Sequence, residues 1–330
     1  NRFNPMTANQ KNMGRLPILS RVDLEKLEKK VYIEPISSDL PTHTHRSDGN
    51  TGMPFKFIYS EREIIICHTV LMFRHPLFEK ISFEKLLSRK PFVVLGKIGF
   101  RYVFEVDFFN KVFPTVQVSD FDNSLLRAEI YKSINEAAPA ILMGFGSLLV
   151  ALARYVLIDK VSLSLLAIRT TGAPISSSDK EMIALAFRVP IIDTLSGDGT
   201  GWLGFECPAN PNRYHVNSEH VILEVVDKAG QILPTDENGE LVVTSLDFTL
   251  TPIIRFAYAY NDIGRLLSEA CSCGRTLPLL ELSEQRDSDI VLPSGGRVGV
   301  ILLRNLLMDW WMKNRKAKQI QVVQKTLDSI

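Results

Sequence analysis

Four residues of this 330-residue chain could hold a metal ion, judged by their types and spacing. Cys271 and Cys273 form a C-x-C pair, and Cys207 and His215 form a C-x7-H pair upstream of it. A disulfide between residues i and i+2 would be strained, because bridged Cα atoms prefer a separation of about 5.5 Å. Two short ligand pairs separated by a long loop suit tetrahedral Zn²⁺, and four protein ligands leave no open position for catalysis. The spacing therefore predicts a structural zinc site.

Alternatives to this zinc site stay open at the level of sequence. Neither spacing is common in zinc fingers, so the four residues could be ordinary small residues of turns. His220 is an alternative fourth ligand, although a residue just before the apolar run "VILEVV" more often caps or lines a strand. Cys67 has no partner at similar spacing and is expected to be a core residue.

A second candidate site is the polar, glycine-rich stretch "HRSDGNTGMPF" at residues 45–55, within a loop expected from Ser37 to Pro54. Glycines let backbone N–H groups wrap an anion, and Ser, Asn and Thr side chains add donors. A plain surface turn has the same composition, so the stretch by itself is weak evidence for phosphate binding.

The pattern of apolar runs predicts the elements that must position these residues. Between about 55 and 189, apolar runs such as "FVVLGKI" and "LSLLAIRTTG" alternate with helical patterns such as "SDFDNSLLRAEIYKSINEAA" and "SSDKEMIALAF". This alternation is typical of an α/β fold with a covered, largely parallel sheet. After Pro190, the runs "EHVILEVVD", "GELVVTSL" and "TPIIRFAYAY" are separated by turn signals and predict a smaller β-rich subdomain. Near the ends of the chain, Ser20 is expected to cap a helix, and 297–316 is expected to be helical.

The composition argues against some classes of binding partner and against a membrane span. The formal net charge of +1 does not provide the clustered basic surface that a nucleic-acid binder needs. The apolar stretch 138–158 contains Arg154 and is interrupted by "GFGS", so we expect a buried strand followed by a helix rather than a membrane span. The sequence shows no secretion signal, which favours a cytoplasmic protein with reduced cysteines.

Several stretches together resemble the adenylate-forming (AMP-binding) ligases, specifically the phenylacetate-CoA ligase and capsule-biosynthesis-like branch. The loop "SDGNTGMP" is similar to the family's phosphate loop T-S-G-T-T-G-x-P, although Asp48 and Asn50 depart from it. The resemblance continues in order through "AIRTTGAPIS", "VPIIDTLSGDGTGWLGFECP", "YHVNSEHVILEVVD", "GELVVTSLDFTLTPIIRF", "CSCGRTLP" and "LSEQRDSDIVLPSGGRV". It covers most of the chain, and the combination is far more specific than any single motif.

The resemblance implies an enzyme that activates a small organic acid, such as an aromatic acid, with ATP and Mg²⁺ and then transfers the acyl group to coenzyme A. The implied phosphate contacts are Ser47, Gly49, Asn50, Thr51 and Gly52; the adenine wall is Gly172, Ala173 and Pro174; the ribose contacts are Asp262 and Arg286; and the structural Zn²⁺ ligands are Cys207, His215, Cys271 and Cys273. Thr51 and Asp198 are the candidate catalytic residues. A homodimer is left open, and no nucleic acid or membrane partner is expected.

This sequence departs from the family where the nucleotide binds. The family's Glu, which holds the Mg²⁺ of ATP, aligns with Gly199, and the Tyr that stacks on adenine aligns with Leu195. Asp198 could supply the missing carboxylate because the glycine-rich "GDGTG" segment is flexible, or it could be a turn residue without a ligand. The spacing from Arg255 to Asp262 is also longer than in the family. A non-catalytic relative that acts as a zinc-stabilised binding or scaffold module is therefore the competing hypothesis.

The expected organisation has three parts. Residues 1–190 form an α/β core with the phosphate loop and adenine pocket, 191–285 form the β-rich subdomain with the zinc site, and 286–330 form the hinge and the start of a C-terminal domain. The fold class expected is α/β: a large core domain of the adenylate-forming type with a mixed, largely parallel sheet, a smaller β-rich subdomain and most of the C-terminal lid absent. We accordingly expect the sequence to be a piece of a longer protein.

Overall fold

The computed structural model describes residues 13–14, 16–20, 23–24, 26, 42–46, 56–60, 63, 74–79, 84, 88–97, 115–118, 121–171, 175, 177–197, 199–246, 253–257, 262–283, 290–294 and 297–298. Its elements in chain order are β1 (Thr42–Arg46), β2 (Lys56–Ser60), the 3-10 helix Pro76–Glu79, β3 (Lys90–Lys97), β4 (Thr115–Val118), α5 (Ser124–Ala137), β5 (Pro139–Phe145), α6 (Gly146–Asp159), β6 (Ala167–Thr171), α7 (Ser177–Phe187), β7 (Ile191–Gly197), β8 (Gly201–Cys207), β9 (Asn210–Val216), β10 (Val221–Val226), β11 (Gly239–Ser245), β12 (Phe256–Ala257), β13 (Ile263–Leu267), β14 (Leu279–Leu282), β15 (Ile290–Val291) and β16 (Arg297–Val298).

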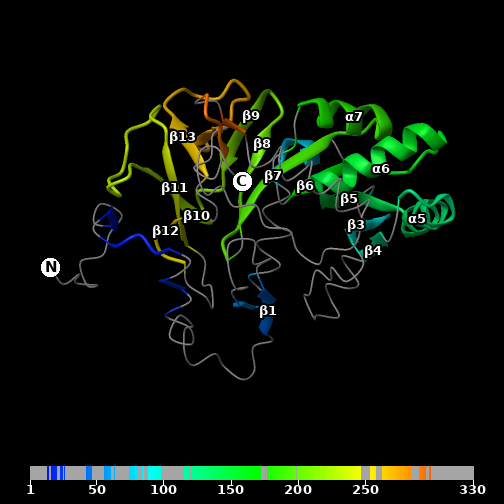
Figure 1. The fold of residues 1–330 in the computed structure, drawn as a ribbon, viewed down its shortest axis with the longest axis horizontal. Helices are drawn as coiled ribbons and strands as arrows, with labels where there is room; N and C mark the ends of the chain where they lie inside the picture. Colours follow the sequence, from blue (N-terminus) through cyan, green and yellow to red (C-terminus); the bar gives the residue numbers. More distant parts are fainter. Residues whose placement is uncertain are drawn as a thin grey trace.

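One half of the main sheet is parallel and lies beneath helices (Figure 1). Its strands lie in the order β4-β3-β5-β6-β7, and each neighbouring pair is parallel. Ile134, Leu149 and Ile183 of the three helices pack on one face, in one cluster with Leu142 and Ile168 of the strands. The predicted helices at α5 and α7 and the predicted strand and helix within 138–158 are confirmed.

The other half of the sheet is antiparallel. From β7 the order continues β8-β9-β14-β13-β11-β10, with β12 beside β11, and every described pair in this half is antiparallel. The sheet is therefore mixed, and only its N-terminal half is parallel. Because β7 starts at Ile191 and pairs with strands of both halves, one sheet runs through the expected boundary at residue 190, and the proposed division into three parts stays a prediction.

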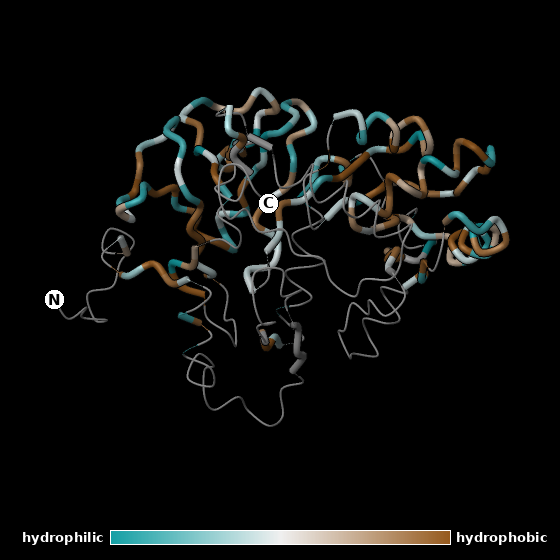
Figure 2. Tube along the Cα trace, in the orientation of Figure 1, coloured by the Kyte–Doolittle hydropathy of each residue, from teal (hydrophilic) through white to brown (hydrophobic). Residues whose placement is uncertain are grey.

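The face of the sheet opposite the helices is covered by residues from early in the chain. Leu24, Phe57 and Leu77 form one buried cluster with strand residues that include Ile141 and Ile192. Apolar segments concentrate along the strands and the inner sides of the helices, and hydrophilic segments lie at many of the turns (Figure 2). The two faces thus have separate cores.

Three predictions about local structure concern residues that the structure describes, and they can be compared with it. Ser20 Oγ accepts from the Asp23 N–H at 3.3 Å and Asp23 Oδ2 accepts from the Ser20 N–H at 2.9 Å, which confirms the predicted cap. The loop expected from Ser37 to Pro54 is wrong at 42–46, because "THTHR" pairs antiparallel with β2; alternating β-branched threonines favour extended backbone there. The helix expected over 297–316 is wrong at its first two residues, which form β16, where a strand partner outweighs local helical pattern.

No helix among the described residues is long and apolar enough to cross a membrane.

Candidate metal centre and nucleotide segments

Cys207, His215, Cys271 and Cys273 come together in one cluster, as the sequence predicts. Their ligand atoms all lie within 4.8 Å of one another. The Cys207 and Cys271 Sγ atoms are 3.5 Å apart, and His215 Nε2 is 3.2 Å from Cys273 Sγ. Zn–S bonds of about 2.3 Å in a tetrahedron place sulfurs about 3.8 Å apart, so this cluster has the size and the donor set for a tetrahedral Zn²⁺. The three cysteines are free thiols rather than disulfides.

Strands from both ends of the β-rich region position the cluster. Cys207 ends β8 and His215 lies on β9, where it pairs with Leu279 of β14. The loop that precedes β14 carries the C-x-C pair, so strand pairing across β9 and β14 brings Cys271 to Cys207. Both of these cysteines are buried, at 8% and 0% exposure.

The protonation of the cluster suits a cation. Burial lowers the pKa of His215 and the Arg275 guanidinium lowers it further, against an opposing contribution from the Leu277 backbone, so the ring is neutral and Nε2 can offer its lone pair. Burial raises the pKa of the Cys271 thiol to about 11. Burial also acts to raise the pKa of Cys273, but the backbone N–H of Arg275 and the neighbouring thiols outweigh it, and the net shift is downward. A bound divalent cation deprotonates such thiols outright.

Asn210 is a member of this site that the sequence analysis missed. Its Nδ2 donates to Cys271 Sγ at 3.1 Å and lies 3.7 Å from Cys207 Sγ. Donors to sulfur stabilise thiolates and orient metal ligands. The signal in the sequence is slight: an Asn three residues after Cys207 in "CPAN".

His220 is not a ligand of the cluster. Its Nε2 lies 2.8 Å from the Thr200 carbonyl oxygen, and the side chain is 2% exposed just before β10. The alternative of His220 as a fourth ligand is therefore wrong, because its imidazole is engaged in the core. Cys67 lies outside the described residues.

Most of the candidate nucleotide contacts lie outside the described residues. These are Ser47, Gly49, Asn50, Thr51, Gly52, Gly172, Ala173, Pro174, Asp198 and Arg286. Two of these segments directly follow described strands, β6 and β7. The ends of these strands contact each other: Thr171 Oγ1 of β6 is 3.2 Å from Ser196 Oγ of β7. Carboxyl ends of parallel strands are where α/β sheets bind ligands. Asp262 is described: it is 8% exposed, and its carbonyl accepts from the Leu241 N–H at 3.0 Å.

Position 199 is filled by a neighbouring side chain rather than open to a carboxylate. Gly199 has φ of +81°, and a Cβ built there would lie 2.7 Å from Phe57 Cδ1, inside van der Waals contact. Its N–H donates to Tyr59 Oη at 2.8 Å. Leu195 is 8% exposed and packs in the apolar core of the antiparallel half. The structure thus accommodates the two departures from the family pattern by packing.

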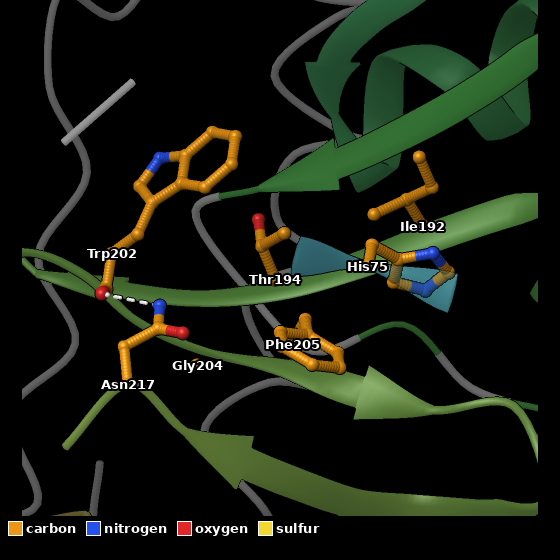
Figure 3. A pocket seen from close by; sticks show the side chains of 7 residues that line it. All are labelled: His75, Ile192, Thr194, Trp202, Gly204, Phe205 and Asn217. Atoms are coloured by element: carbon orange, nitrogen blue, oxygen red, sulfur yellow. Dashed lines mark hydrogen bonds between the residues drawn. The ribbon is translucent and has the colours of Figure 1, made fainter. Parts of the chain in front are cut away.

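A small buried hollow lies among side chains of β7, β8 and their neighbours (Figure 3). Its lining residues are His75, Ile192, Thr194, Trp202, Gly204, Phe205 and Asn217. Asn217 Nδ2 donates to the Trp202 carbonyl at 3.0 Å, and Oδ1 of the same amide accepts no hydrogen bond within the described structure. The space has no room for a water molecule. As it stands, this hollow is packed interior and not a substrate pocket.

Solved structures identify the fold. No family model matches the sequence, and no curated protein matches it. The structure of a 2-hydroxyisobutyryl-CoA ligase in the postadenylation state, in complex with R3-HIB-AMP, superposes with a TM-score of 0.69 and 17% identity, covering 93% of this chain and 66% of that one. An open conformation of that ligase with 2-HIB-AMP and CoA gives 0.66 and 17%, covering 90% and 66%. An anthranilate CoA ligase in complex with anthranoyl-AMP gives 0.53 and 13%, covering 80% and 51%.

These similarities define the fold class of the chain. The chain has the core fold of adenylate-forming acyl-CoA ligases over most of its described length, with an α/β arrangement built on a large mixed sheet. It spans 66% of the length of the 2-hydroxyisobutyryl-CoA ligase and carries a Cys3His cluster that could bind zinc.

Proposed function

We propose that the chain is the core of an AMP-forming acid–thiol ligase. The carboxylate of an organic acid attacks the α-phosphate of ATP and releases pyrophosphate, and the thiol of coenzyme A then takes the acyl group and releases AMP. The observation that carries this proposal is the match over 93% of the chain to a ligase solved with an acyl-adenylate. The sequence motifs add the phenylacetate-CoA ligase-like branch, and with it a small aromatic acid as the substrate.

The proposed roles follow the segments that resemble the family. Thr51 and the loop around it hold the phosphates, Gly172 to Pro174 form the adenine wall, and Asp262 and Arg286 bind the ribose. Mg²⁺, held with the help of Asp198, would neutralise phosphate charge. Electrostatic stabilisation of this kind is the main source of catalysis at phosphorus centres.

The proposed role of zinc is structural. Four protein ligands close the coordination sphere, so no position is left for a substrate. The ion would join the β8–β9 connection to the loop before β14, which are more than 60 residues apart in the chain. Zinc binding would therefore contribute to folding rather than to the reaction.

Calorimetric titration of the zinc-loaded chain with Mg·ATP tests the ligase function without knowledge of the acid. We expect saturable binding close to one site per chain. Thr51→Ala is the matched variant, because it should weaken binding if the loop holds phosphate. An absence of binding heat in a folded chain with one equivalent of zinc would contradict the proposal.

A second candidate function is favoured by the packing at position 199. A non-catalytic relative that serves as a zinc-stabilised binding or scaffold module needs no carboxylate there, and Phe57 occupies the space that such a side chain would enter. This candidate predicts a folded, zinc-bound chain that does not bind Mg·ATP. Formation of a homodimer stays a prediction under either function, and analytical ultracentrifugation would test it.

A further inference from the structure

A group of polar side chains, here called the polar junction, lies where α7 meets β6 to β9. It consists of Thr170, Lys180, Asp193, Glu206 and Tyr214. Lys180 Nζ is 3.1 Å from Asp193 Oδ2 and 2.6 Å from Glu206 Oε1. Thr170 Oγ1 donates to Asp193 Oδ1 at 2.8 Å, and Tyr214 Oη donates to Asp193 Oδ2 at 3.1 Å. The side chains of Asp193 and Glu206 are only 4% and 14% exposed, so the Lys180 ammonium offsets part of the negative charge of two carboxylates that are largely removed from water.

Two members of the polar junction are chain neighbours of metal ligands. Glu206 precedes Cys207 on β8, and Tyr214 precedes His215 on β9. Glu206 pairs with Tyr214 across these strands. Because successive side chains of a strand point to opposite faces, the polar junction and the His215 ring lie on opposite faces of the same strand pair.

The start of β9 is also held by the polar junction. Glu206 Oε1 accepts from the Asn212 N–H at 2.7 Å, in addition to its contact with Lys180. Asn210, the first residue of β9, donates to Cys271 Sγ at 3.1 Å. The lysine therefore acts on the stretch of chain that carries one thiol ligand and a donor to another.

The remaining acidic member lies on β7. Asp193 is two residues before Leu195, so it belongs to the strand that leads into the candidate nucleotide segment. We propose that Lys180 is a positioning residue that couples the metal cluster to β7: its ammonium holds Asp193 and Glu206 together, so that metal ordering of β8 and β9 also orders β7. The proposal rests on the proposed zinc site and is independent of the proposed ligase reaction.

Removal of the ammonium should break this coupling. Without Lys180, the Asp193 and Glu206 carboxylates lose the cation that contacts both of them, and their like charges repel in a poorly hydrated setting. Lys180→Met keeps the length of the side chain and removes the charge, whereas Lys180→Arg keeps the charge. Lys132→Met is the matched control, because Lys132 is 73% exposed on α5 and pairs with Glu136 at 3.7 Å.

Hydrogen exchange by mass spectrometry, with and without zinc, tests the coupling on the full chain. In the wild type we expect zinc removal to speed exchange of the β7 amides about tenfold or more, since local opening follows the loss of nearby stabilising contacts. In Lys180→Met we expect the effect of zinc on β7 to fall to about twofold or less, with Lys180→Arg restoring most of it. Lys132→Met should behave as the wild type.

Four results would overturn the proposal. One is a wild-type β7 that exchanges at the same rate with and without zinc, and another is an equal effect of zinc in the wild type and in Lys180→Met. If Lys180→Met does not fold, Glu206→Gln replaces it, and an undiminished effect of zinc in that variant is equally contradictory. If the chain binds no zinc by native mass spectrometry, the zinc site is wrong and the coupling proposal is wrong with it. This result is distinct from a failure to bind Mg·ATP, which would contradict only the ligase function.

Discussion

Phe57 is the residue that decides what position 199 can hold. Gly199 combines a φ of +81° with close approach of the Phe57 ring, whereas Gly230 has a similar φ of +78° and meets only the flexible Ile18 side chain, at 3.1 Å. A substitution at Gly230 therefore introduces backbone strain alone, whereas a substitution at Gly199 introduces the same strain together with a steric clash with Phe57. A carboxylate at position 199 requires a change at Phe57 as well as at the glycine.

We expect Gly230→Ala to lower the free energy of unfolding by about 1 kcal/mol through its backbone strain. Gly199→Ala should cost about 1–3 kcal/mol more, because overpacking adds to the same strain. Phe57→Ala combined with Gly199→Glu should be less destabilised than the sum of its single variants. Urea denaturation measures all of these values, and equal costs for the two alanine variants would contradict the role of Phe57.

At the metal cluster we expect Cys273→Ser to lose zinc and stability together. The serine hydroxyl is a poor ligand for Zn²⁺ beside two thiolates, and the folding free energy that the metal supplies would be reduced. Zinc content by atomic absorption and the thermal midpoint check this outcome. Cys67→Ser is the matched cysteine variant and should keep one equivalent of zinc; a Cys273→Ser chain with full zinc content would exclude the cluster as the site.

At the scale of elements, a buried ion pair joins the early chain to the antiparallel half of the sheet. Arg255 Nε is 2.9 Å from Glu224 Oε2, and the two side chains are 2% and 7% exposed. The same guanidinium donates to the carbonyl oxygens of Gly14 and Leu16, at 3.0 and 2.5 Å. The backbone N–H of Leu19 donates to the Arg255 carbonyl at 2.8 Å. Arg255 thus holds Gly14, Leu16 and Leu19 against the region of β10 and β12.

We expect Glu224→Ala to lower the free energy of unfolding by about 3–5 kcal/mol, because it leaves the Arg255 charge buried without its carboxylate. Glu136→Ala removes an exposed partner on α5 and should cost about 0.5 kcal/mol or less. Urea denaturation of both variants makes the comparison. Similar small losses in the two variants would show that Glu224 is not required to compensate Arg255.

For the whole molecule, the pH dependence of stability should contain a contribution from His75. Burial, followed by the Arg275 charge, lowers the pKa of His75 to about 4, whereas an unfolded chain has a value of about 6.5. Between these values the unfolded chain binds more protons, so stability rises with pH. The contribution is fully present above about pH 6.5 and is lost as the pH falls toward about 4.

We expect the wild type to lose about 2 kcal/mol more than His75→Gln when the pH falls from about 7 to about 5. The comparison isolates His75, because all other titrating groups are shared by the two proteins. Urea denaturation at a series of pH values measures the difference. Parallel curves for the two proteins would show that His75 is not buried in its neutral form.

Much of the fold and of the metal site could be predicted from the sequence. The spacing of apolar residues predicted α5, α6 and α7 and the strands around them. Each helix buries one apolar stripe, and each strand of the covered sheet buries both of its faces. The four cluster residues stand out by type, because Cys and His are the side chains that Zn²⁺ prefers, although neither spacing is common in zinc fingers. Those inferences depend only on local pattern and on the chemistry of single side chains.

Tertiary structure alone decided the rest. The strand order joins both halves into one sheet and places β14 between β9 and β13, which local pattern does not specify. It also brings Phe57 to Gly199, Lys180 to Glu206, and Arg255 to Glu224. These partners are 26 to 142 residues apart along the chain, and their contacts arise from packing and charge neutralisation, for which a single sequence contains no periodic signal.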